Sequence, residues 1–393
     1  MPRPSHRFQS LPPYPLHDVP VRKRALLARG VDVIDLGAGD ADLPAPPAAI
    51  EALKAALEVP AMHRYGFNLG YVPFREAISA WMQRRFGLAF DPTTEILPLL
   101  GSKEGIAHFA LAFLERGDVA IVPEPGYLVY AGGALLSEAT PYPYALRPQN
   151  RFLVDLDDVP DDVLRRTKLL YLNYPNNPTA AIAPREYLAD VVRRCRERDI
   201  LLVYDNAYSE ISFDGYVPPS IFEIDGAREV ALEFHSLSKT YNMTGWRQGW
   251  AVGNPSLIGT LAKMKTFVDT GSFMALQAAG AAALESWAEF APKNVAVFQE
   301  RRDAAVASFR DAGFACDVPK GAMYLWIALP DGVGSHEFAS RLLDDEGVVV
   351  LPGASFGAGG EGFFRVSFIV PPERMRDAAQ RSGRVLASML SPV

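Results

Sequence analysis

Lys239 is the residue of this sequence whose surroundings best suit covalent chemistry. It lies in the segment HSLSKTYNMTGWR (235–247), which follows an apolar run and also holds Ser236, Ser238 and Arg247. A lysine amine kept out of water favours its neutral form, which is a nucleophile able to form a Schiff base with a carbonyl compound. Short motifs also arise by chance, and the alternative for Lys239 taken alone is a surface lysine in a loop.

Asp205 ends a second segment of chemical interest, ILLVYDNAYSE (200–210), in which Tyr208 follows three residues later. A carboxylate at the end of a buried strand needs a cation or hydrogen bonds. Ligands of open α/β sheets bind at the carboxyl ends of the strands. Asp205 could therefore pair with the protonated nitrogen of a pyridine ring. The alternative is a structural role as a helix N-cap.

Two loops offer polar groups in comparable positions. In LNYPNNPTA (172–180), Asn177 and Pro178 follow a strand, although these residues also make ordinary turns. In LLGSKEG (99–105), a strand passes through Gly101 and Ser102 into a helix, whose free N–H groups could bind a phosphate. The segment does not match the G-x-x-x-x-G-K-[ST] pattern of a P-loop.

The elements that must position these residues follow an alternating pattern. Short apolar runs, each typical of a strand buried on both faces, occur at 95–100, 119–123, 168–174, 200–205, 230–236 and 249–254. Helical stretches separate them, so the pattern predicts an α/β domain with a mostly parallel sheet. A long helix is expected from Pro292 to Asp311. The later strands and helices alternate less regularly, as in a smaller α+β domain.

Composition excludes several classes of protein. The chain has 393 residues, 39 Lys and Arg against 46 Asp and Glu, and two cysteines, Cys195 and Cys316. The net charge of −7 argues against a nucleic-acid binder, and the cysteine count excludes a disulfide framework. No apolar run reaches about 18 residues, the N-terminus lacks the apolar core of a signal peptide, and the six histidines are scattered. We expect a cytoplasmic enzyme with no metal site and no membrane partner.

The motifs in this order resemble the class I and II aminotransferases, which are pyridoxal 5'-phosphate (PLP) enzymes of fold type I. The resemblance extends from LGAGDADLP (36–44) to FFRVSF (363–368), and LPPYPLHDV, PEPGYLVY and YPNNPTA are similar to the LL-diaminopimelate aminotransferase branch. It implies a seven-stranded sheet in an αβα sandwich plus a smaller domain. The implied parts are 1–46 (arm and start of the small domain), 47–290 (PLP domain) and 291–393 (rest of the small domain).

The resemblance also implies a role for each site residue. Lys239, Asp205 and Tyr208 would be catalytic: Lys239 would hold PLP as a Schiff base and shuttle the proton, and Asp205 would pair with the pyridine nitrogen. The other ring contacts would come from Asn177 and Tyr208 at the ring hydroxyl oxygen and from Tyr127 on the ring face. The phosphate ligands would be Ser102, Lys103, Ser236, Ser238, Arg247 and, from the partner subunit of a homodimer, Tyr65. The substrate α-carboxylate would contact Arg365, Asn177 and the backbone of Gly39.

The implied activity is ping-pong transfer of an amino group between an amino acid and a 2-oxo acid. In the diaminopimelate branch an acidic residue commonly follows the partner tyrosine, whereas this sequence has Phe67, Asn68 and Leu69. Aminotransferases for alanine, aspartate, methionine or aromatic donors therefore stay open, as does a PLP carbon–sulfur β-lyase. A non-catalytic PLP-binding regulator is a further alternative, against which the intact set of Lys239, Asp205 and Arg365 argues.

One glycine pattern points elsewhere. Gly357, Gly359 and Gly362 match the G-x-G-x-x-G spacing of dinucleotide sites, but they lead into a strand rather than a helix. We interpret them as a flexible loop near the substrate site.

Overall fold

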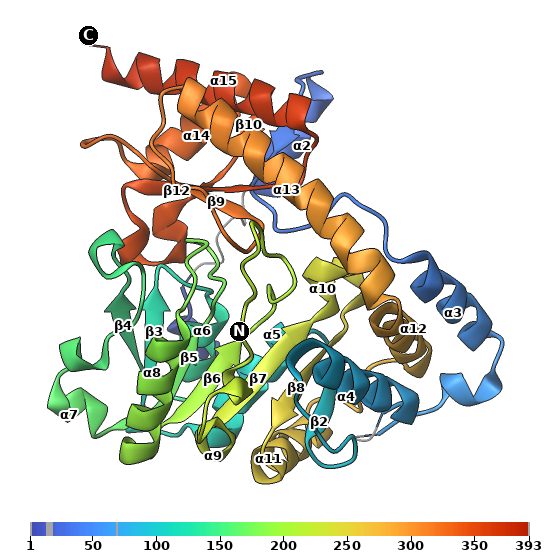
Figure 1. Ribbon diagram of the computed structural model, residues 1–393. Coiled ribbons are helices and arrows are strands. Elements are labelled where there is room, and N and C mark those ends of the chain that lie inside the picture. The colour runs from blue at the N-terminus through green and yellow to red at the C-terminus, as the bar shows by residue number, and fades with distance from the viewer. Residues whose placement is uncertain (1, 13–18, 68–69, 392–393) are drawn as a thin grey trace.

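The molecule has a lower body built on a large sheet and an upper body built on a small one (Figure 1). The computed structural model describes residues 2–12, 19–67 and 70–391. Helix α13 (Trp287–Asp311) runs along both bodies. The predicted α/β class, with a mostly parallel seven-stranded sheet, is confirmed.

The large sheet has the strand order β2-β8-β7-β6-β5-β3-β4. Its pairings are parallel except for the two made by β8, which runs against both of its neighbours. All of its strands except β4 coincide with the predicted apolar runs. The seven strands of the sheet are β2 (Ile96–Leu99), β3 (Val119–Glu124), β4 (Thr140–Ala145), β5 (Thr167–Leu172), β6 (Leu201–Asp205), β7 (Ala231–Ser236) and β8 (Gly249–Gly253).

Helices cover both faces of this sheet, which is why its strands are continuously apolar. In β5, Leu170 and Leu172 belong to the core on one face, and Leu169 and Tyr171 to the core on the other. The first face is covered by α3 (Pro47–Leu57), α4 (Val72–Phe86), α8 (Arg185–Arg198) and α12 (Met274–Glu285). The second is covered by α5 (Ser102–Phe113), α6 (Val129–Leu136) and α11 (Pro255–Thr266). Shorter helices are α1 (His6–Gln9), α7 (Asp161–Leu164), α9 (Ala227–Val230) and α10 (Leu237–Thr240).

The upper body joins the two ends of the chain. Strand β1 (Ile34–Asp35) pairs in parallel with β10 (Val348–Val349). An antiparallel sheet of order β11-β12-β9 lies beside them, formed by β11 (Leu351–Pro352), β12 (Phe363–Ser367) and β9 (Tyr324–Ala328). Helices α2 (Val19–Ala28), α14 (Ser335–Glu346) and α15 (Pro372–Leu390) complete it. The pairing of β1 with β10 supports a discontinuous small domain, and the division at residues 46 and 290 stays a prediction.

Two elements differ from expectation. Helix α13 begins at Trp287, five residues before the predicted Pro292, so the proline lies inside the helix rather than at its first position. Strand β4 was not predicted, because Pro141 and Pro143 break the strand pattern. A proline has no backbone N–H to donate. It is tolerated on an edge strand such as β4, because one side of that strand has no neighbouring strand to accept a hydrogen bond.

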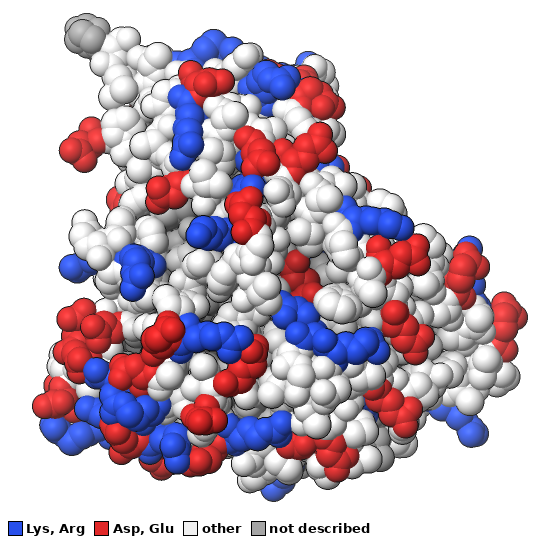
Figure 2. Space-filling model, viewed as in Figure 1, with Lys and Arg blue, Asp and Glu red and all other residues white. Residues whose placement is uncertain are grey.

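The surface carries both signs of charge in mixture. Figure 2 shows Lys and Arg interspersed with Asp and Glu over the visible face. The arginines of α8 follow this pattern, since Arg193 and Arg194 pair with Asp190, Glu197 and Asp157. Among the described residues, no helix is both long and apolar enough to cross a membrane.

Candidate active site

A cavity of about 390 Å³ lies where the parallel strands of the large sheet end and the upper body begins. Asp205 closes β6, Ser236 closes β7 and Arg365 lies in β12, so groups far apart in sequence meet here. Every predicted site residue except Tyr65 lines the cavity. The predicted residues found in its lining are Gly39, Ser102, Lys103, Tyr127, Asn177, Asp205, Tyr208, Ser236, Ser238, Lys239, Arg247 and Arg365.

Asp205 is a buried carboxylate, 5% exposed, with one oxygen bonded and the other not. Tyr130 Oη donates a hydrogen bond of 2.9 Å to Asp205 Oδ2. Oδ1 is buried with no hydrogen-bond partner among the described residues. Burial raises the pKa of Asp205 to about 6, and the Tyr130 hydrogen bond opposes that rise. A cation at Oδ1 would stabilise the ionised form of Asp205.

Lys239 projects from α10 into the same cavity. Ser236 caps this short helix, because its Oγ accepts a hydrogen bond of 3.1 Å from the Ser238 N–H. Because this capped helix follows β7 directly, the chain changes direction at the end of the strand and Lys239 lies in the cavity lining. Lys239 Nζ donates to the carbonyl oxygen of Gly39, which belongs to the N-terminal part of the chain.

The N-terminus of α5 forms an open cradle. Gly101 has a φ of +82°, and a Cβ at this position would run into the guanidinium of Arg247. A Cβ on Gly249 would lie 2.8 Å from the Ser102 backbone nitrogen. Arg247 donates to the Thr244 carbonyl at 2.7 Å and to the Leu100 carbonyl at 3.3 Å. Helix N–H groups and a guanidinium around glycines suit a phosphate.

Arg365 is held at the far wall of the cavity by neutral oxygens. Nη1 donates to Asn177 Oδ1 at 2.7 Å, and Nη2 donates to the Gly37 carbonyl at 2.5 Å. Its guanidinium carbon lies 4.2 Å from the centroid of the Tyr324 ring and 5.0 Å from that of Phe356. A buried guanidinium that lines the cavity suits a carboxylate ligand, because its planar pair of donors matches the two carboxylate oxygens.

Sequence reasoning missed three residues of the site. Tyr130 bonds Asp205, Tyr324 bonds Tyr208 at 2.7 Å between the hydroxyls, and Asn173 donates to the Asp205 carbonyl at 2.7 Å. Asn173 carried a usable signal, since it is the first polar residue after the apolar run of β5. Tyr130 and Tyr324 lie in apolar patterns and carried none.

Comparison with known proteins identifies the family. Residues 31–381 match the model of "Aminotransferase class I and II". The chain belongs to the class I and II aminotransferase family. An LL-diaminopimelate aminotransferase of Aquifex aeolicus is 46% identical over 377 residues, covering 96% of this chain and 97% of the relative. One from Desulforudis audaxviator is 45% identical, covering 95% and 96%. Substrate-bound BacF of Bacillus subtilis has a TM-score of 0.94 at 35% identity, covering 98% of each chain.

The predicted family resemblance and enzyme class are confirmed: the chain is a PLP-dependent aminotransferase. The residues present also fit this cofactor on structural grounds. The buried Asp205 Oδ1 leaves an acceptor for a pyridinium nitrogen, and the Gly101 cradle leaves room for a phosphate beside Arg247. Asp205 and Arg247 line the same cavity, so one cavity offers a group for a pyridine ring and a group for its phosphate arm.

Tyr65 is not among the residues lining the aminotransferase cavity. Its side chain is 71% exposed, and its ring lies 5.7 Å from that of the exposed Phe67. The positions after this tyrosine, where the diaminopimelate branch commonly has an acidic residue, are Phe67 and residues 68–69. Of these, 68–69 lie outside the described residues, as does most of the LPPYPLHDV arm motif, at residues 13–18.

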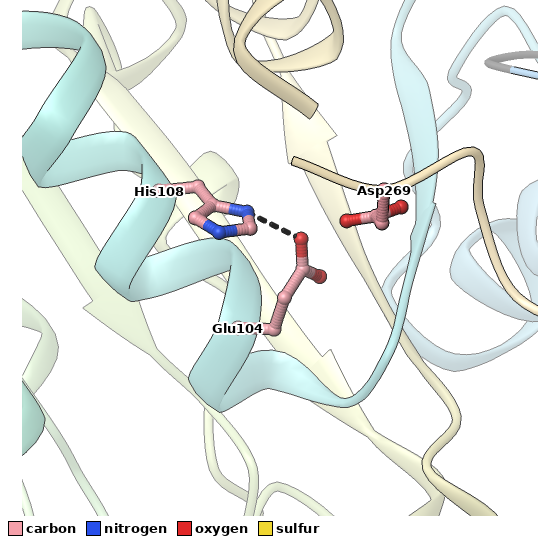
Figure 3. Close-up of side chains that lie close together, drawn as sticks. All are labelled: Glu104, His108 and Asp269. Carbon is pink, nitrogen blue, oxygen red and sulfur yellow. Dashed lines mark hydrogen bonds and ion pairs between the residues drawn. The ribbon is translucent and has the colours of Figure 1, made fainter. Parts of the chain in front are cut away.

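One cluster beside the cradle has metal-ligand composition. Figure 3 shows Glu104 and His108 on one helix with Asp269 opposite. Their ligand atoms lie within 4.8 Å of one another, but Lys265 Nζ lies 2.6 Å from Glu104 and 3.1 Å from Asp269. The lysine ammonium contacts both carboxylates, so the cluster is an ion-pair network at the start of α5.

The glycine pattern at 357–362 has a packing explanation. A Cβ on Gly357 would lie 2.5 Å from Glu124 Cδ, and one on Gly359 would lie 2.7 Å from the Glu124 carbonyl oxygen. Both glycines therefore permit this loop to lie directly on the end of β3. The dinucleotide spacing is coincidental.

Proposed function

We propose that this protein binds PLP in the cavity and transfers an amino group between an amino acid and a 2-oxo acid. The observation that carries the proposal is the placement of three groups around one cavity. Asp205 has a buried oxygen with no hydrogen-bond partner among the described residues, Lys239 projects a primary amine, and Arg365 contributes a guanidinium to the cavity lining. These are the acceptor, the amine and the carboxylate receptor that the reaction needs.

The cofactor contacts would be divided among the strand ends. Asp205 would hold the ring nitrogen, Tyr208 and Asn177 the ring oxygen, and Tyr127 a ring face. The phosphate would contact Ser102, Lys103, Ser236, Ser238 and Arg247. Arg365 would bind the substrate α-carboxylate, and the adjoining backbone of Gly39 would close that end of the site.

PLP, when bound, supplies an electron sink for the bond pair left when the substrate Cα loses its proton. The chain's own residues do the rest. The Lys239 amine would take the Cα proton as a general base and would later return a proton as a general acid. Asp205, in its ionised form, would hold the ring nitrogen. Arg365 fixes the carboxylate, so that the Cα–H bond faces Lys239.

Tyr65 supports a homodimer in which each site is completed by the partner subunit. Its exposed ring belongs to an apolar surface, because Phe67 beside it is 66% exposed and His63 packs against the partly exposed Phe273 with ring centroids 5.8 Å apart. Exposed apolar side chains gathered in one region mark an interface. In this proposal Tyr65 reaches the phosphate cradle of the other subunit.

LL-diaminopimelate is the first donor to test, because the relatives cited above carry that name. Its distal ammonium needs a carboxylate. Beyond Asp205, the acids that line the cavity and its neighbour are Asp40 and Glu124. Asp40 accepts from Thr244 Oγ1, and burial raises the pKa of Glu124.

A second candidate is an aminotransferase for donors with uncharged side chains. A cavity of about 710 Å³ adjoins the site and shares Tyr127, Leu128, Ser355 and Phe356 with it. Its other walls are largely apolar, with Val122, Ala131, Ala339, Leu343, Val349 and Val350. Apolar walls next to the substrate site favour an apolar side chain by roughly 0.8 kcal/mol per buried CH₂.

The test is a donor screen on PLP-loaded protein. Loss of the cofactor's visible absorption on adding LL-diaminopimelate, alanine, aspartate, methionine or phenylalanine would rank the donors, and a 2-oxo acid should restore it. Release of ammonia and pyruvate from a cysteine conjugate without any 2-oxo acid would indicate a β-lyase instead. Failure to bind PLP, or no response to any donor, would contradict the proposal.

A further inference from the structure

Tyr324 is a lining residue that contacts both Tyr208 and Arg365. It begins β9, is 1% exposed and lines the cavity. Its hydroxyl lies 2.7 Å from the Tyr208 hydroxyl, and the two ring planes meet at 73°. The face of the same ring lies 4.2 Å from the Arg365 guanidinium carbon. Tyr324 thus contacts both a proposed cofactor residue and the proposed carboxylate receptor.

The N-terminal part of the chain closes over this tyrosine. A Cβ built on Gly39 would lie 2.5 Å from Tyr324 Oη and 3.4 Å from Lys239 Nζ. The Tyr324 hydroxyl is therefore confined between Tyr208 and the Gly39 backbone. A hydroxyl confined on two sides has few orientations. The Tyr324 hydroxyl can therefore fix the direction of its hydrogen bond with Tyr208.

We propose that Tyr324 is a positioning residue that orients Tyr208 through its hydroxyl and Arg365 through its ring. This inference rests on the proposed function, because it assigns the two contacts to the cofactor end and the carboxylate end of that reaction. The alternative is that Tyr324 only fills the core of the upper body, to which its ring also belongs.

The hydroxyl contact has a direction. Burial, followed by the neighbouring Tyr324, raises the pKa of Tyr208 well above its usual range, so Tyr208 keeps its proton. If Tyr208 donates that proton to the ring oxygen of the cofactor, its own oxygen is left to accept from Tyr324. Two hydroxyls in such a chain polarise each other, so the outer bond strengthens the inner one.

The ring contact acts on a different group. Arg365 already donates to Asn177 and Gly37 at the edges of its plane, and the Tyr324 ring covers one of its faces. A cation over an aromatic face at this distance is attracted to it, and the ring limits rotation of the guanidinium. The two functions of Tyr324 are therefore separable: one needs the hydroxyl and the other only the ring.

Tyr324→Phe tests the hydroxyl by a spectroscopic readout. On PLP-loaded protein, the pH midpoint of the cofactor's visible absorption should rise by about 0.4 to 1 unit, the size of one ordinary hydrogen bond. The midpoint rises because the hydrogen bond from Tyr208, which stabilises the anionic form of the ring oxygen, becomes weaker without the Tyr324 hydroxyl. In a Tyr208→Phe background the same substitution should have no further effect. An unchanged midpoint, or an equal shift without Tyr208, would overturn the hydroxyl role.

Tyr324→Leu tests the ring by binding of 3-phenylpropionate, a carboxylic acid that does not react. Its dissociation constant should rise about 2- to 30-fold in Tyr324→Leu and stay within twofold in Tyr324→Phe. Equal effects in both variants, or none in either, would overturn the separate role of the ring.

Two controls keep the outcomes distinct. Tyr144→Phe removes a hydrogen-bonded tyrosine hydroxyl on the edge strand β4, where Tyr144 Oη donates to Asp158 at 2.9 Å, and should leave both readouts unchanged. If Tyr324→Phe does not fold, Gly39→Ala displaces the same hydroxyl and should raise the midpoint in the same direction. If wild-type protein shows no PLP absorption, the proposed function fails; if wild type absorbs and no variant shifts, only this inference fails.

Discussion

Tyr130 donates a hydrogen bond of 2.9 Å to one oxygen of Asp205, while the other oxygen of that carboxylate is buried and has no hydrogen-bond partner in the described part of the chain. Tyr130 lies on α6 and Asp205 ends β6, so a helix packed on the sheet holds the carboxylate at a fixed angle. The bonded oxygen fixes the orientation of the group, and the free one is left for a cation.

Removing the Tyr130 hydroxyl should weaken PLP binding. In Tyr130→Phe, the ionised form of Asp205 loses a charge-assisted hydrogen bond, and the PLP dissociation constant should rise about 10- to 100-fold. Titration of cofactor-free protein with PLP measures it. Tyr171→Phe is the matched control, because Tyr171 stacks on Tyr130 at 4.8 Å while its own buried hydroxyl has no partner among the described residues. A similar loss in both variants would argue against the contact.

Asp205 should also make cofactor-free protein less stable as the pH rises. Its folded pKa of about 6 exceeds the unfolded value, so the favourable contribution is complete below about pH 4 and is lost as the pH passes 6. The total is about 3 kcal/mol. Asp205→Asn should therefore gain melting temperature relative to wild type between pH 4.5 and 7.5, without PLP. A pH-independent difference would show that Asp205 ionises as it does in the unfolded chain.

Arg365→Lys should lose carboxylate binding while retaining the cofactor. Lysine keeps the positive charge but not the planar pair of donors, so 3-phenylpropionate should bind about 10- to 100-fold more weakly. The visible absorption of bound PLP should keep its wavelength, since Arg365 is assigned to the substrate. A loss of PLP affinity equal to the loss of carboxylate affinity would place Arg365 in the cofactor site instead.

Lys265 should be required for stability rather than for metal binding. Its side chain is 3% exposed and pairs with Glu104 and Asp269, so Lys265→Met would leave two partly buried carboxylates facing each other. We expect a loss of about 3 kcal/mol, against less than about 0.5 kcal/mol for the exposed Lys263→Met on the same helix. Thermal melting with and without a chelator distinguishes the two roles. A chelator that destabilised wild type would indicate a bound metal.

How much of this site could be predicted depends on the kind of pattern each residue follows. Asp205, Ser236 and Lys239 come directly after apolar strands, and a parallel sheet brings such strand ends to one edge, so the sequence predicts their meeting. Arg365 is the single charge of an apolar strand and is conspicuous for that reason.

Tyr130 and Tyr324 could not be found in this way. Each is one aromatic residue among apolar neighbours, and its hydroxyl matters only because tertiary packing points it at Asp205 or Tyr208. The start of α13 was misplaced for a local reason, since a proline suits the first turn of a helix and Pro292 was taken to mark it. Strand β4 was missed because its edge position, which tolerates prolines, is a property of the whole sheet.

The partner-subunit role of Tyr65 predicts complementation between two damaged chains. Lys239→Ala protein should lack turnover and keep an intact Tyr65, while Tyr65→Ala protein should keep Lys239 and lose most phosphate affinity. After the two are unfolded and refolded together, half of the dimers should be mixed, and one site of each mixed dimer combines both intact residues. Turnover should then recover to roughly a quarter of the wild-type value.

Lys239→Ala refolded with Arg365→Ala is the control, because in the structure these two residues line the same cavity of one chain. Its mixed dimers would hold one site without the lysine and one without the arginine, so turnover should not recover in this mixture. No recovery in either mixture would show that Tyr65 acts within its own chain, whereas recovery in both would show that Arg365 also acts across the interface.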